Sequence, residues 1–81
     1  MDTINIIEEI KKYIEDNILS KDIKLTAHTN LQNAGIDSFS TVEIILFIER
    51  KYGVVIPDNK MSPDNFRTLE ALSKTVRELI P

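Results

Sequence analysis

Residues 35–58 read GIDSFSTVEIILFIERKYGVVIPD, and this stretch decides the fold. Its middle part, residues 38–52, is rich in apolar residues and has no glycine or proline, which predicts a helix over that range. Asp37 is a good N-cap directly before it, and Gly53 stands just past its expected end. Apolar side chains occupy more than one face of this helix. We therefore expect the helix to lie centrally in a bundle or to offer one face to something else.

The sequence before this stretch predicts one amphipathic helix followed by a loop. The helix is expected to begin at Asp2 or Thr3, either of which can cap it. The apolar face expected for it consists of Ile7, Ile10, Ile14 and Ile18. Residues 20–36 lack helical periodicity and predict a long loop, which Leu25 and Leu31 could anchor to the core.

The sequence after it predicts an extended connection and two more helices. Residues 54–56 are expected to be extended, with Ile56 packed inward. A Ser-Pro pair opens residues 62–67 and predicts a short helix with Phe66 facing inward. Thr68 can cap the last helix. Its expected buried stripe consists of Leu69, Leu72, Val76 and Leu79. The fold class predicted is all-α, a small four-helix bundle of three main helices and one short one.

Composition bounds the kind of protein this is. The chain has 81 residues, 42% of them hydrophobic, which suits one small domain spanning residues 1–81. Its 13 acidic and 10 basic residues give a net charge of −3, which argues against nucleic acid as the main partner. With no cysteine, a disulfide framework, a thiolate metal site and a cysteine nucleophile are excluded. Any thiol must come from a cofactor.

The apolar runs are too short to predict a membrane span. The N-terminal pattern is that of an amphipathic helix and not of a secretion signal, so we expect a cytoplasmic protein.

Ser38 is the residue best suited to carry chemistry. It follows a turn at residues 33–35, in which Gly35 can take a positive φ, and it opens the expected apolar helix. The start of a helix presents free N–H groups and partial positive charge, which favour a phosphate there. A plainer interpretation is that Asp37 and Ser38 are only capping residues, since such pairs are common at helix starts. His28, the only histidine, has no metal-ligand partner at useful spacing and is expected to be an ordinary loop residue; no metal site is predicted.

The ordered pattern over residues 35–58 resembles the central segment of acyl carrier proteins. The matching residues are Gly35, Asp37, Ser38, Phe39, Val42, Glu43, Tyr52, Gly53, Ile56 and Pro57. The flanking helices and the long first loop fit as well, so the resemblance covers nearly the whole chain.

The resemblance implies a covalent cofactor and a non-catalytic role. Ser38 would receive 4'-phosphopantetheine from coenzyme A through a separate phosphopantetheinyl transferase. The thiol at the end of this arm would hold an acyl, aminoacyl or polyketide chain as a thioester for partner ligases or synthases. The residues expected to meet these partners are Asp37, Phe39, Val42, Glu43 and Leu46. We also expect a monomer, since a carrier has to visit several partners.

The second helix differs from the strongly acidic one usual in carriers of fatty acid synthesis. Arg50 and Lys51 near its end balance Glu43 and Glu49. The run MSPDNFRTLEAL, residues 61–72, resembles freestanding carriers of specialised pathways. We therefore favour a dedicated carrier of acyl groups that serves a dedicated ligase or synthase.

Two alternatives to an acyl carrier remain open. The first is a carrier of amino acids or peptides that an adenylating ligase loads. The second is an unmodified helical interaction module that uses Phe39 and Leu46 as an apolar docking face. An enzyme is not expected, since no pairing of a nucleophile with a base is visible.

Overall fold

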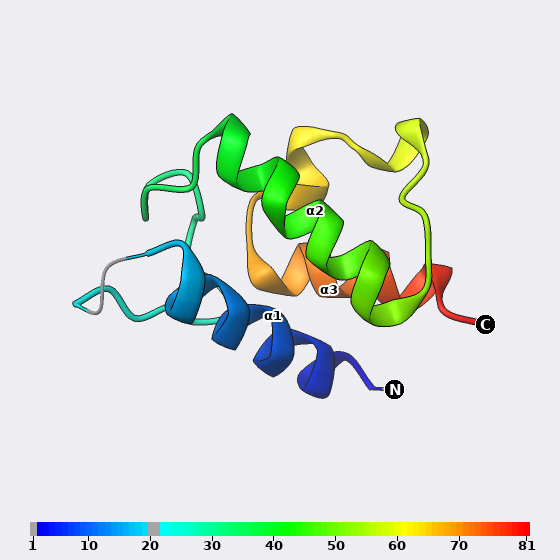
Figure 1. Cartoon of the computed structure of the whole chain (residues 1–81), viewed down its shortest axis with the longest axis horizontal. Coiled ribbons are helices and arrows are strands. Elements are labelled where there is room, and N and C mark those ends of the chain that lie inside the picture. Colours follow the sequence, from blue (N-terminus) through cyan, green and yellow to red (C-terminus); the bar gives the residue numbers. More distant parts are fainter. Residues whose placement is uncertain (1, 20–21) are drawn as a thin grey trace.

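The computed structural model describes residues 2–19 and 22–81, and within them it is helical, with no strand. Long connections join the helices, and both chain ends lie on the same side of the molecule (Figure 1). The elements in chain order are α1 (Thr3–Asn17), α2 (Ser38–Tyr52), the 3-10 turns η1 (Asp58–Lys60) and η2 (Pro63–Phe66), and α3 (Leu69–Leu79). The all-helical class and the three main helices are thus confirmed. No helix in the described part of the chain has the length and apolarity needed to span a bilayer.

The short helix predicted over residues 62–67 is present as the 3-10 turn η2, which begins at Pro63. A second 3-10 turn, η1, precedes it and was not predicted, and Ser62 makes no side-chain capping bond. Asn65 N donates to Ser62 O at 3.1 Å, the i to i+3 bond of a 3-10 turn. The segment is too short to close α-helical bonds before Thr68 caps α3 by accepting from Ala71 N at 3.1 Å. Phe66 does pack partly against the core, as expected.

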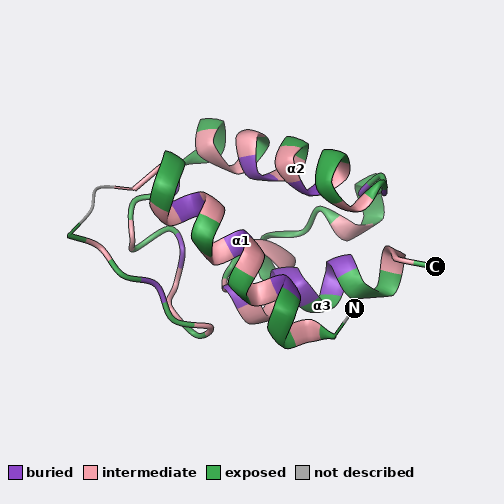
Figure 2. Cartoon of the chain, turned by 60° about the horizontal axis from the view of Figure 1, so that its bottom comes forward, coloured by how far each residue is buried: buried purple, intermediate pink, exposed green. Residues whose placement is uncertain are grey.

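The core lies where α1 and α3 face each other, and α2 covers it from one side (Figure 2). The fully buried residues of α1 are Ile6, Ile10 and Ile14. The stripe predicted for α1 was therefore centred one residue too far along, because Ile7 and Ile18 are only partly buried at its edge. From α2, only Ile44 and Ile48 are buried; Ile45 and Phe47 pack partly against the core, and other apolar side chains of the helix stay exposed.

Long backbone connections are held by hydrogen bonds to distant elements. Leu25 and Leu31 are buried as predicted, and Leu31 N donates to Arg67 O at 2.8 Å. The part of the predicted loop at residues 20–21 lies outside the described residues. After α2, the extended connection has Ile56 buried, also as predicted, and Ile56 N donates to Glu49 Oε2 at 3.1 Å. The Leu31 bond, with that from Glu70 N to Ala27 O at 3.0 Å, fixes the loop that leads into α2 against the segment around the start of α3, and the Ile56 bond holds the next connection to α2.

Candidate functional site

Ser38 is the first residue of α2, and its side chain is exposed. The turn before it is closed by Gly35, whose φ of 108° is accessible to glycine and strained for other residues. Ile36, buried at the end of this turn, donates its N–H to Leu31 O at 3.0 Å. The hydroxyl of Ser38 therefore stands at a fixed point on the surface, where a helix begins.

Asp37 caps α2 as the sequence predicted. Its Oδ1 accepts from Ser40 N at 2.8 Å, and its backbone oxygen accepts from both the N–H and the Oγ1 of Thr41 at 2.9 Å. The bond from the Ser40 N–H lowers the pKa of the Asp37 carboxyl below its usual value. The first N–H groups of α2, on Ser38 and Phe39, have no partner within the helix and give its tip a partial positive charge. A phosphate ester on Ser38 would lie next to these groups.

A hollow of about 330 Å³ opens beside Ser38. It lies between the start of α2, the end of the long loop and η2. Its lining includes Thr41 from α2, Ile36 from the loop, and Met61, Phe66 and Arg67 from the segment before α3. Its walls mix polar and apolar groups, which suits a chain that has both amide and methylene groups. The surroundings of Ser38 therefore fit a phosphopantetheine ester: a phosphate at the helix tip and a hollow next to it for the arm.

Sequence reasoning missed most of the lining of this hollow. Met61, Phe66 and Arg67 are more than 20 residues from Ser38, and only the folded loop brings them together. No local motif marks them, although the resemblance over residues 61–72 pointed to the same segment.

The five residues expected to meet partners fall on connected parts of α2. Phe39, Val42 and Leu46 are exposed by 74%, 54% and 49%, and their spacing puts them on one stripe of the helix. Asp37 is exposed at the start of this stripe, and Glu43 lies half-buried beside it. Large exposed apolar side chains in a row mark a surface that can be covered by a partner. Hereafter Phe39, Val42 and Leu46 are called the α2 stripe.

Other polar residues form ordinary surface contacts. His28 Nδ1 lies 3.5 Å from Glu70 Oε2, and both side chains are well exposed. Among residues 2–19 and 22–81, no three histidine, aspartate or glutamate side chains are grouped to hold a metal ion.

Comparison with known proteins identifies the class to which this fold and site belong. Residues 6–76 match the family model described as "Phosphopantetheine attachment site". The chain therefore belongs to the family of carrier proteins that bear phosphopantetheine. Its cofactor is 4'-phosphopantetheine, attached covalently, and this arm supplies the thiol that the cysteine-free chain lacks.

Individual relatives fall into two groups by name. "Aminoacyl carrier protein 1" of Bradyrhizobium diazoefficiens is 31% identical over 71 residues, which are 88% of this chain and 77% of the relative. "Acyl carrier protein" of Rickettsia bellii is 37% identical over 57 residues, 69% of this chain and 66% of the relative.

A solved structure is similar over nearly the whole chain. It is that of Bradyrhizobium japonicum glycine:[carrier protein] ligase complexed with its cognate carrier protein and an analogue of glycyl adenylate. The match has a TM-score of 0.76 and 28% identity, and it covers 94% of this chain and 96% of the other.

Proposed function

We propose that Ser38 Oγ bears the 4'-phosphopantetheine arm and that the chain presents a carboxylic acid, held on this arm as a thioester, to partner enzymes. The observation that carries the proposal is the exposed hydroxyl at the first position of α2, beside a hollow, in a phosphopantetheine-bearing chain. An attachment residue has to be open to a transferase, and Ser38 is open. The chain itself carries the group and leaves the chemistry to its partners.

In this proposal the residues around Ser38 divide the work. The N–H groups at the tip of α2 stabilise the negative charge of the ester, while Asp37 fixes the start of the helix. The α2 stripe, with Asp37 and Glu43 beside it, meets the phosphopantetheinyl transferase first and the loading enzyme later.

An intact-mass measurement tests the attachment residue. The chain is co-expressed with a broad-specificity phosphopantetheinyl transferase, and the mass is compared with that of Ser38→Ala and Ser40→Ala. Ser40 is a matched control because it lies on the same first turn of α2. We expect the arm on wild type and Ser40→Ala and none on Ser38→Ala, with helical circular dichroism unchanged in all three. Folded wild-type protein that stays at its unmodified mass would favour the plain interaction module instead.

Two classes of cargo are equally well supported. The sequence favoured acyl groups, and the Rickettsia relative is named an acyl carrier protein. An aminoacyl cargo is supported by the Bradyrhizobium relative and by the likeness to a carrier complexed with a glycine ligase. We therefore propose a ligase-loaded carrier of either acyl or aminoacyl groups.

A loading assay separates the two classes. Purified holo-protein is offered to an acyl ligase with fatty acids and ATP, and to a glycine:[carrier protein] ligase with glycine and ATP. The thioester is detected by mass and by its release with hydroxylamine. Loading with amino acids alone would refute acyl cargo, and loading with fatty acids alone would refute the aminoacyl alternative.

A further inference from the structure

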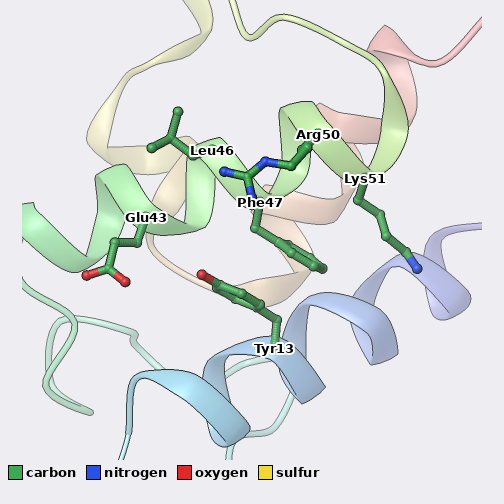
Figure 3. A pocket seen from close by; sticks show the side chains of 6 residues that line it. All are labelled: Tyr13, Glu43, Leu46, Phe47, Arg50 and Lys51. Atoms are coloured by element: carbon green, nitrogen blue, oxygen red, sulfur yellow. The ribbon is translucent and has the colours of Figure 1, made fainter.

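A second hollow, of about 430 Å³, lies between α1 and α2 and shares no residue with the hollow beside Ser38. Its lining consists of Tyr13, Glu43, Leu46, Phe47, Arg50 and Lys51. We call it the α1–α2 groove. Its walls are stacked aromatic rings: the centroids of Tyr13 and Phe47 lie 4.1 Å apart, with the ring planes inclined by 16°. Figure 3 shows Tyr13 rising from α1 to meet Phe47 from α2.

Two basic side chains, Arg50 and Lys51, border this groove, and only Lys51 is in an ion pair among the described residues. Lys51 Nζ lies 3.7 Å from Glu9 Oε2, and Glu9 also accepts from Tyr52 OH at 2.6 Å. Arg50 is exposed, and none of the ion pairs among the described residues includes it. In Figure 3 the side chain of Arg50 points along α2 toward Leu46, and both residues line the groove. A guanidinium that lines a groove together with apolar side chains is well suited to a carboxylate that arrives together with an apolar group.

The groove is continuous with the α2 stripe. Leu46 belongs to both, being the last residue of the stripe and part of the groove's lining. Glu43 and Arg50 are seven residues apart, so they stand roughly 10 Å from each other along the helix axis. A partner that covers α2 lengthwise therefore meets negative charge at Asp37 and Glu43 and positive charge at Arg50.

We infer that the α1–α2 groove docks a segment of the loading enzyme in which an apolar side chain stands next to an aspartate or glutamate. The apolar side chain would cover Leu46 and Phe47, and the carboxylate would pair with Arg50. Charge complementarity selects this occupant at the Arg50 end of the groove, because Lys51 is paired with Glu9, whereas Arg50 is left to attract a carboxylate and to repel a basic side chain. The Glu43 carboxylate lies further back along α2, at the other end of the lining. The inference deepens the proposed function and rests on it in taking the occupant to be part of a partner enzyme.

Peptide titration of the apo-protein tests the chemistry of the groove without any partner enzyme. The probes are acetyl-Phe-Glu-amide and acetyl-Phe-Lys-amide, followed by the backbone amide signals of ¹⁵N-labelled protein. We expect the glutamyl peptide to shift the amides of Leu46, Phe47 and Arg50 and to bind at least about fivefold more tightly than the lysyl peptide. Equal binding of the two peptides, shifts centred on other residues, or no shifts at all would overturn the inference.

Charge-reversal variants test the role of Arg50. Arg50→Glu should reverse the preference between the peptides, and Arg50→Gln should abolish it. The matched control is Arg77→Glu, which reverses another exposed arginine in the last turn of a helix, α3. An equal effect of Arg77→Glu would reduce the observation to net charge and overturn the inference.

Loading kinetics connect the groove to the proposed function. With a ligase that loads the wild type, Arg50→Glu should lower kcat/KM for loading roughly tenfold, whereas transfer of the arm by the phosphopantetheinyl transferase stays within about twofold. Shifts at the groove amides that appear on thioester loading alone would assign the groove to the cargo and overturn the partner assignment. If no ligase loads the protein, the proposed function fails, while the peptide titration still decides the chemistry of the groove.

Discussion

Replacing Phe39 by alanine should separate docking from folding. Full burial of a phenylalanine side chain is worth about 1.5–3 kcal/mol. Phe39 is 74% exposed, so folding has used about a quarter of that, roughly 0.4–0.8 kcal/mol. A partner that covers the ring can gain the remaining part, about 1–2 kcal/mol. At 1.4 kcal/mol for each factor of ten, Phe39→Ala should lower kcat/KM for arm transfer or loading by about 5- to 30-fold.

The assay pairs enzyme kinetics with urea unfolding of the same variants. Ile4→Ala is the matched control, because Ile4 is 70% exposed but lies on α1, away from the α2 stripe. Ile48→Ala is the control for folding, because Ile48 is fully buried and its truncation should cost about 2–5 kcal/mol. Phe39→Ala should unfold almost like Ile4→Ala and yet react much more slowly.

Two results would refute this reasoning. A loss of stability in Phe39→Ala as large as that in Ile48→Ala would mean that the ring belongs to the core. Unchanged kinetics in both transfer and loading would mean that no partner covers Phe39.

Substitutions at three further positions test how α2 is held. The Asp37 carboxylate caps α2 and has a lowered pKa. Its stabilising effect is therefore fully present above pH 3.8, the usual pKa of aspartate, and is lost as the pH falls through the lowered pKa. Asp37→Asn, which still caps α2, should remove this pH dependence from acid unfolding curves. Gly53 has a φ of 67° and open space around it, so a substitution there strains the backbone without a steric clash. Gly53→Ala should therefore lower the free energy of unfolding in urea by about 1–2 kcal/mol, and Gly53→Asn should lower it less. Equal losses in the two variants would show that backbone strain is not the cause. Burial, with the hydrogen bond and charge of Glu9, raises the pKa of Tyr52 above its usual value of 10.0. The Tyr52–Glu9 bond therefore stabilises the fold fully below pH 10.0, and this stabilisation is lost as the pH rises through the raised pKa. Tyr52→Phe should cost about 1 kcal/mol of unfolding free energy at pH 7, and no loss in urea unfolding would show that the bond contributes nothing.

The helices could be predicted where the signal is local. Asp37 and Gly53 predicted both ends of α2, and Thr68 predicted the start of α3. The Ser-Pro pair predicted where η2 begins but not its 3-10 hydrogen bonds, and η1 has no such pair before it. The exact core face of α1 depends on how α1 sits on α3, so a shift from Ile7 to Ile6 is a tertiary effect that periodicity alone does not resolve.

The candidate site was predictable at its centre and not at its edges. The position of Ser38 at a helix start could be predicted because that start, its cap and the preceding turn are contiguous in sequence. The hollow beside it and the α1–α2 groove are assembled from separate elements, so nothing in the local sequence around Tyr13 pairs it with Phe47. The charge of Arg50 and Lys51 was visible in the sequence, but only the structure shows that Glu9 pairs with Lys51.

The burial pattern of α2 explains how a carrier can expose an apolar helix and remain folded. α2 buries only two residues completely, whereas α3 buries five, so α1 and α3 supply most of the core and α2 lies over it. The far end of α2 is held instead by polar contacts, from Glu49 to the N–H of Ile56 and from Tyr52 to Glu9. Because these contacts leave the α2 stripe untouched, substitutions on the stripe can change partner choice at little cost in stability. Because the core and the polar contacts hold α2, the hydroxyl of Ser38 stays in a fixed place while the exposed surface beside it can differ between carriers.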